Sequence, residues 1–295
     1  MDSETIESPS AHVYLEYDPA NPPPRPGPQW TRFVCISDTH SHFFPVPDGD
    51  VLLHSGDLTE TGTLRNFEVT MDWLRKLPHH NKIIIAGNHD LTLHRGWYGQ
   101  NYSRWHGPHK QDEEKIMDLV KGEEAHKAGI VYLEDEEYDF QAKEDGRVWS
   151  VYGSPGQWSP WFYDWAFNYN PGAEAERLLA KFPKTDILLT KDTDSYSLTH
   201  GPPHNVLDST LAGDHVGCPT LAAHMQKLRP RIHLFGHIHE GHGAELREWS
   251  QGESTIYVNA ANWPMGPRAE EIRSKGVRPT FGGPGFRPII VDLLD

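Results

Sequence analysis

Residues 32–40 read RFVCISDTH, an apolar run that passes directly into aspartate, threonine and histidine. The run has the length of a β-strand, and its consecutive apolar residues are typical of a strand covered on both faces. Comparable runs follow along the chain as DVLLHS, KIIIAG, GIVYL, RVWSVYG, DILLT, RIHLFG, TIYVNA and PIIVDLL, at 50–55, 82–87, 129–133, 147–153, 186–190, 231–236, 255–260 and 288–294. Between several of them, apolar residues recur at helical spacing, as at Leu64, Phe67, Met71 and Leu74. The pattern predicts an α/β fold.

About nine strands are more than one small sheet usually holds, so we expect two stacked sheets with helices outside. A single parallel sheet is the alternative. The 295 residues are enough for one large domain. Residues 1–30 are proline-rich, which predicts a flexible leader, and the domain is expected to span 31–295. Residues 266–288 are rich in Gly, Pro and Arg, which predicts a long surface excursion.

The chain has 27 Lys plus Arg against 42 Asp plus Glu, a formal charge of -15. Such a surface repels a polyanion at long range, so nucleic acid is a poor candidate partner. Two cysteines cannot build a disulfide framework, which favours a reducing compartment such as the cytoplasm. The first residues lack the pattern of a secretory signal, and no apolar run has the length of a membrane span. No membrane association and no particular protein partner is indicated.

Four of the predicted strands end in residues of metal-ligand type. They are Asp38 and His40 after 32–37, Asp57 after 50–55, Asn88, His89 and Asp90 after 82–87, and His237 and His239 after 231–236. In open α/β sheets, ligands gather beyond the carboxyl ends of strands, so these residues are expected to converge. Asp-x-His and His-x-His each direct two side chains to one face of an extended segment.

Carboxylates and imidazoles suit Mn, Fe and Zn. A pair of ions needs a bridging ligand, and the lone acid Asp57 is the natural candidate. Two ions about 3.5 to 4 Å apart clamp the attacking and leaving oxygens of a displacement and activate water as a hydroxide. Two divalent cations less two carboxylates and a hydroxide leave roughly one positive charge, which favours an anionic substrate such as a phosphate ester.

His89 lies beside Asn88 in the sequence but is expected to point elsewhere. A histidine in that position suits stabilisation of developing charge or protonation of the leaving oxygen. Asp90 is expected to orient the His89 ring, as carboxylates behind catalytic imidazoles do.

At this point the residues resemble a known family. The ordered motifs DTH at 38–40, GD at 56–57, GNHD at 87–90, HGPP at 200–203 and GHIH at 236–239 resemble those of the calcineurin-like metallophosphoesterases. The resemblance covers roughly 32–262. The sequences GHIHEGHG, HGPPHNVLD and GSP followed by DWAFN are similar in particular to metallophosphoesterase-domain-containing proteins of the class III phosphodiesterase type.

The resemblance implies a four-layer α/β/β/α sandwich and two divalent or trivalent metal ions, Mn, Fe or Zn. It implies that one ion takes Asp38, His40, Asp57 and His239, that the other takes Asp57, Asn88, His200 and His237, and that His89 is the catalytic histidine. The family strand that matches DILLT runs straight into HGPP, whereas here KDTDSYSLT, residues 191–199, stands between them. This insert is either a tolerated loop or an artefact of coding-sequence assembly, and the role of His200 depends on which.

Three kinds of function remain open. The first is a metal-dependent phosphodiesterase acting on small or nucleotide-type esters. The second is a phosphatase acting on proteins or small phosphomonoesters. The third is a low-activity scaffold that binds a nucleotide at the same site. Retention of His89, His237 and the other candidate ligands favours an enzyme.

Several residues near these motifs have either a role in the site or an ordinary structural role. The aromatic residues between Trp158 and Tyr169 could stack on a nucleobase, although packing is the favoured interpretation. His204, His215 and His242 flank ligands or glycine turns, and the sequence leaves open whether they contact phosphate.

Overall fold

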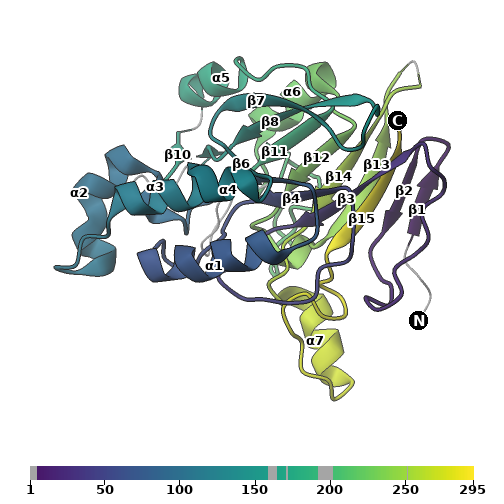
Figure 1. Ribbon diagram of the computed structural model, residues 1–295. Helices are drawn as coiled ribbons and strands as arrows, with labels where there is room; N and C mark the ends of the chain where they lie inside the picture. The colour runs from purple at the N-terminus through teal and green to yellow at the C-terminus, as the bar shows by residue number, and fades with distance from the viewer. Residues whose placement is uncertain (1–4, 159–164, 171, 192–201, 251) are drawn as a thin grey trace.

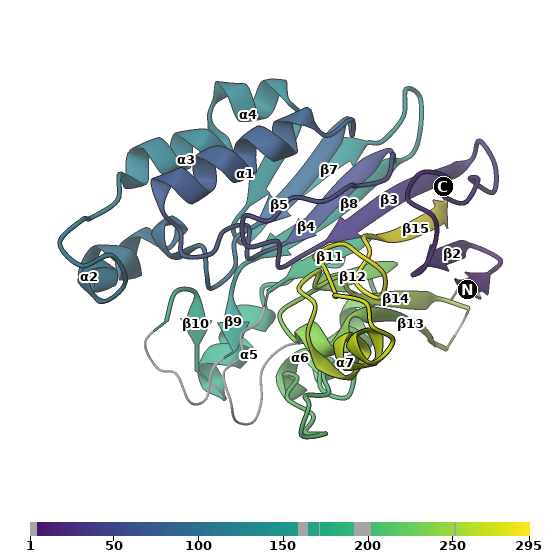
Figure 2. The same ribbon diagram turned by 90° about the horizontal axis from the view of Figure 1, so that it is seen from below.

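The computed structural model describes residues 5–158, 165–170, 172–191, 202–250 and 252–295. All nine apolar runs form strands, and these strands belong to two main sheets (Figure 1). The sheets lie face to face, with α1, α3 and α4 outside one of them and α5 and α6 outside the other (Figure 2). The predicted α/β/β/α architecture is therefore confirmed.

The first sheet has seven strands and mixes parallel and antiparallel pairs. Pairing is antiparallel from β1 to β3 and parallel from β3 to β6. In spatial order the strands are β1 (Thr5–Ser8), β2 (Ala11–Tyr14), β15 (Ile289–Leu294), β3 (Trp30–Ile36), β4 (Val51–Ser55), β5 (Asn81–Ile85) and β6 (Ile130–Leu133).

The second sheet has six strands, with a parallel centre and an antiparallel strand at each edge. In spatial order they are β13 (Gly243–Glu248), β14 (Ser254–Asn259), β12 (Ile232–Phe235), β11 (Ile187–Thr190), β8 (Val148–Ser154) and β7 (Glu136–Gln141). A separate parallel pair joins β9 (Gln157–Trp158) to β10 (Asn168–Tyr169).

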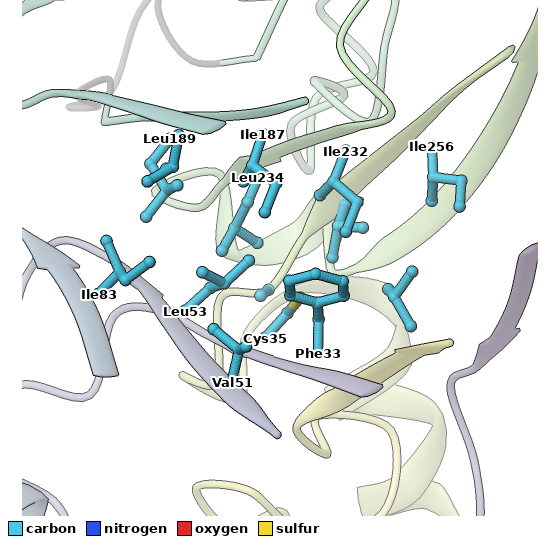
Figure 3. Close-up of a cluster of buried hydrophobic side chains, with 14 of the residues drawn as sticks. Phe33, Cys35, Val51, Leu53, Ile83, Ile187, Leu189, Ile232, Leu234 and Ile256 are labelled. Atoms are coloured by element: carbon cyan, nitrogen blue, oxygen red, sulfur yellow. The ribbon is translucent and has the colours of Figure 1, made fainter. Parts of the chain in front are cut away.

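Burial on both faces explains why the apolar runs are continuous. In β3, Phe33 and Cys35 face the second sheet, while Val34 and Ile36 pack on the helix side. Figure 3 shows the layer between the sheets, where Phe33 and Cys35 lie opposite Ile232 of β12. This core fixes the two sheets against each other.

Helices cover the outer faces of both sheets. On the first sheet, Phe67, Met71 and Leu74 of α1 are fully buried at the spacing that the sequence predicted. The helices of the chain are α1 (Leu64–Lys76), α2 (Arg95–His106), α3 (Glu113–Lys121), α4 (Glu123–Lys127), α5 (Ala173–Leu179), α6 (Pro219–Leu228) and α7 (Gly266–Ser274), with 3₁₀ turns η1 (Leu91–Leu93) and η2 (His239–Gly241). Within the described ranges, every helix falls short of the length and apolarity needed to cross a membrane.

Two expectations about chain organisation are corrected. The fold does not begin near Thr31, because β1 and β2 pair into the first sheet and β2 lies against β15. Ala11 and Val13 are buried on one face of β2, an alternation that the proline-rich context obscured. Residues 266–288 are not wholly an irregular excursion, since their first part forms α7, which has a proline in its first turn.

His233 of β12 carries a prediction about acid stability. The ring is fully buried, its Nε2 lies 3.0 Å from Thr190 Oγ1, and burial lowers its pKa from 6.5 to about 3. The unfolded chain therefore binds a proton at His233 more readily than the folded chain. The neutral ring's contribution to the free energy of unfolding is present above pH 6.5 and is lost as the pH falls towards 3. When the pH is lowered from 7 to 4.5, we expect the free energy of unfolding to fall by about 2 kcal/mol less in His233→Gln than in the wild type. Urea titrations at the two pH values measure this difference.

His80→Gln is the control, because it makes the same substitution at an exposed histidine. Equal acid sensitivity of the wild type and His233→Gln would contradict the prediction.

Candidate metal centre

The carboxyl ends of parallel strands from both sheets meet at one edge of the sandwich. Asp38 and His40 follow β3, and Asp57 follows β4 of the same sheet. His237 and His239 follow β12 of the second sheet. Pairing continues past the strands, because the amides of Asp38 and His40 donate hydrogen bonds to the carbonyls of Gly56 and Asp57. The ligand-bearing loops are thus held together by backbone contacts.

Several of these residues have unusual backbone conformations. Asp38, His40, Asp57 and His237 have φ values of 54°, 45°, 51° and 71°. Left-handed conformations are uncommon for residues other than glycine and cluster at functional sites, where the surrounding structure stabilises them. The strain therefore coincides with the strand ends that the sequence identified.

Two glycines allow the loops to approach this closely. A Cβ at Gly87 would clash with the carboxylate and amide nitrogen of Asp57, and one at Gly236 would clash with Asp38 and Ser37. Each motif glycine is needed because a carboxylate occupies the space of its missing side chain.

Side chains with metal-ligand chemistry come together here. Among the described residues, three overlapping groups have ligand atoms within 4.8 Å of one another: Asp38, His40 and His239; His40, Asp57 and His89; and Asp38, Asp57 and His237. Asp38, His40 and Asp57 each belong to two groups, so the three groups form one continuous cluster.

The donor atoms at the centre suit metal ions. Both ring nitrogens of His40, Nε2 of His237 and Oδ1 of Asn88 are buried and have no hydrogen-bond partner in the described part of the chain. Buried polar atoms are costly unless they are paired, which makes such a cluster meaningful. Burial is the main cause that holds the pKa values of His40 and His237 well below 6.5, so both rings are neutral, as ligation requires. The residues therefore fit the implied ions.

Lys191 also enters the centre, although no motif of the sequence pointed to it. It is the first residue after β11, its side chain is fully buried, and its Nζ lies 2.5 Å from Asp38 Oδ1 and 3.0 Å from Asp57 Oδ2. Burial alone would raise the pKa of Asp38, but the Lys191 ammonium and the hydrogen bond with His239 hold it well below its usual range. The predicted insert begins at this residue. The rest of it, and the predicted ligand His200, lie outside the described residues.

His89 lies at the rim of the centre. Its ring nitrogen Nδ1 is 2.7 Å from the carbonyl of Glu60, which makes Nδ1 the donor and leaves Nε2 with a lone pair or a proton to transfer. The His89 amide donates to Asp57 Oδ1 at 2.9 Å, and its ring stands edge-on to His40 with centroids 4.6 Å apart. The ring is therefore oriented from behind and faces the cluster.

The predicted contact between Asp90 and the His89 ring is wrong. The Asp90 carboxylate instead accepts hydrogen bonds from the amides of Leu58, Thr59 and Gly87 and from the Thr59 hydroxyl. The turn after β5 directs consecutive side chains apart, so Asp90 ties together the loops that follow β4 and β5. Burial and then the nearby Asp57 raise the pKa of Asp90 to about 7.

An aromatic side chain that the sequence analysis did not identify, Trp263, packs against two of the candidate ligands. Trp263 stacks on His239 with centroids 5.5 Å apart and stands edge-on to His40 at 4.7 Å. Of the aromatic segment between Trp158 and Tyr169, residues 159–164 lie outside the described residues, while Trp165 Nε1 donates to the carbonyl of Asn88. Among the described residues, Trp263 from the loop after β14 and Trp165 therefore both border the candidate ligands.

The three histidines left open by the sequence lie outside the three metal-ligand groups. His215 Nδ1 is 2.6 Å and His204 Nδ1 3.7 Å from the buried carboxylate of Asp208. His242 is buried, has a pKa lowered to about 3 by burial, and donates from Nδ1 to the carbonyl of Ala261. These contacts give each of them a structural environment of its own.

The chain is similar in sequence to known proteins, and a solved structure aligns with it. The family model for calcineurin-like phosphoesterases matches residues 31–241. The human Metallophosphoesterase domain-containing protein 1 is 36% identical over 266 residues, covering 85% of this chain and 71% of that protein. A UPF0046 protein of Caenorhabditis elegans is 30% identical over 249 residues, covering 83% and 74%. A solved structure from Thermus thermophilus aligns with a TM-score of 0.45 at 11% identity over 78% of this chain and 89% of that one.

Proposed function

Because the chain belongs to the calcineurin-like phosphoesterase family, we propose that it hydrolyses small phosphate esters with two bound metal ions. Phosphodiesters are the proposed substrates. The observation that carries the proposal is the convergence of three overlapping ligand groups around buried donor atoms without hydrogen-bond partners among the described residues. Mn, Fe and Zn are the metals that this mixture of carboxylate, amide and imidazole suits.

The division of the ligands between the two ions follows the family motifs, and the three groups bring five of these ligands together: Asp38, His40, Asp57, His237 and His239. We assign Asp38, His40, Asp57 and His239 to one ion and Asp57, Asn88 and His237 to the other, with His200 proposed for the second ion from the family motif. When bound, the ions would supply Lewis-acid stabilisation and an activated water at neutral pH.

The chain's own groups then act on the substrate. The Glu60 carbonyl holds the His89 ring through Nδ1–H, so a second proton carried on Nε2 can pass to the leaving oxygen while the ring keeps its Nδ1 proton. Asp90 is a positioning residue, because its four hydrogen bonds fix the loops that carry Asp57 and His89. Trp263 stacks on His239 and stands edge-on to His40, so it holds these two rings in place beside the substrate.

Two other functions share the same centre. A phosphomonoesterase would use the same ligands with a substrate carrying one more negative charge. A low-activity nucleotide-binding scaffold is favoured by one observation, the burial of the Lys191 ammonium between two ligand carboxylates.

The enzyme proposal is tested by hydrolysis of an aryl phosphodiester, an aryl phosphomonoester and cyclic nucleotides with added Mn²⁺. We expect activity that a chelator removes, and an about 100-fold loss of kcat in His89→Ala because the proton donor is missing. His126→Ala, a change of an exposed histidine, is the matched control. A metal-loaded wild type that is as inert as His89→Ala over all substrates would favour the scaffold.

A further inference from the structure

We infer that the Lys191 ammonium is a resident cation of the metal centre, and that a metal ion must displace it to bind between Asp38 and Asp57. The inference rests on the proposed function and concerns the regulation of the same site. It makes Lys191 a competitor of the metal rather than a partner of it.

The geometry gives Lys191 the position of an ion. Its Nζ contacts one oxygen of each carboxylate, Asp38 Oδ1 at 2.5 Å and Asp57 Oδ2 at 3.0 Å. These two residues are the carboxylates shared between ligand groups. The side chain is fully buried, and its stem packs over Gly56, so the ammonium is held inside the centre and not at its rim.

The two cations exclude each other on electrostatic grounds. A metal ion held by the same two carboxylates would compete with the ammonium for the same oxygens and would lie close to it. Like charges close together in a buried site repel strongly. The carboxylates carry two negative charges, and one ammonium neutralises half of that charge, which stabilises the centre while no metal is bound.

The strand order explains how this residue reaches the site. β11 lies beside β12, the strand that leads to His237 and His239, and both run in the same direction. A residue that directly follows β11 is therefore delivered to the edge where the ligands meet. In this chain that residue is a lysine.

The decisive experiment compares metal affinity in three proteins: the wild type, Lys191→Met and Lys82→Met. Methionine keeps much of the length of the side chain and removes its charge. Lys82 is a matched control, because it is also buried but its Nζ contacts only the carbonyls of His79 and Ala128 among described residues. Proteins purified with Mn²⁺ are stripped by chelation and titrated with Mn²⁺ by calorimetry, with metal content measured after desalting.

We expect Lys191→Met to bind Mn²⁺ roughly 100-fold more tightly than the wild type, and Lys82→Met to match the wild type. Equal affinity of Lys191→Met and the wild type, with metal bound to both, would overturn the inference and leave the proposed function intact. Failure of all three proteins to bind metal would overturn both.

A second measurement uses only the wild type, in case stripped Lys191→Met does not stay folded. Lysines are acylated in the presence of a chelator or of excess Mn²⁺, and modification at Lys191 and Lys82 is quantified by mass spectrometry. We expect Mn²⁺ to raise the labelling of Lys191 several-fold and to leave Lys82 unchanged. Lys191 that stays protected in the Mn²⁺-loaded protein would overturn the inference.

Discussion

Replacing Asp57 with asparagine is expected to lower hydrolysis of an aryl phosphodiester by about 10⁴-fold, through loss of metal binding. Asp57 belongs to two of the three ligand groups, and its carboxylate lies against both His40 and Lys191. Asparagine keeps the shape and one oxygen but removes the negative charge. Each proposed ion therefore loses part of its attraction to the site.

Metal content and kcat/KM measured on the same preparation check this prediction. Asp72→Asn, which changes an exposed carboxylate on α1, is the control for a general effect of the substitution. Thermal melting with circular dichroism verifies that the variant is folded. An Asp57→Asn protein that retains more than about a tenth of the activity with full metal content would show that Asp57 is not a shared ligand.

Replacing Asp292 with alanine is expected to lower the free energy of unfolding by about 3 to 5 kcal/mol. Asp292 of β15 lies opposite Arg32 of β3 in the strand register, and the two form a bidentate pair with distances of 2.8 and 2.7 Å. Their side chains are 0% and 4% exposed. The variant leaves a guanidinium buried without its carboxylate, which is the main source of the cost.

A double variant separates this cost from the value of the pair. Arg32→Met with Asp292→Leu removes both charges, and we expect its stability to lie within about 1 kcal/mol of the wild type. The exposed pair of Arg65 and Glu68 is the comparison, since Glu68→Ala is expected to cost less than about 1 kcal/mol. Urea unfolding at one pH measures all of these values. A cost below about 1 kcal/mol for Asp292→Ala would contradict the prediction.

Strands with mostly buried residues were predictable from the sequence, including β6 at the edge of the first sheet, and edge strands with exposed residues were not. The nine apolar runs are central or doubly covered, so their residues are apolar whichever face they present. β7 and β13 lie at the edges of the second sheet and have mostly exposed or half-buried residues, which leaves little apolar signal. β1 and β2 were missed because prolines nearby suggested a leader, although Ala11 and Val13 alternate as a strand should.

The same contrast applies to the metal centre. Asp38, Asp57 and His237 could be identified because each directly follows a predictable strand and a motif glycine or short turn brings it to a common edge. Lys191 also follows such a strand, but a lysine in a polar stretch is ordinarily a solvated residue. The partners of Asp90 could not be predicted, because they depend on the exact direction in which a turn points its side chain.

The division of the centre between the two sheets links ion binding to the cohesion of the sandwich. Residues from the first sheet, such as Asp38, face residues from the second, such as His237 and Lys191. At this edge the two sheets are held together by charged groups, whereas hydrophobic side chains fill the middle of the interface between them. Any cation bound there links the two sheets, and the strength of the contact between the sheets at this edge depends on which cation is bound.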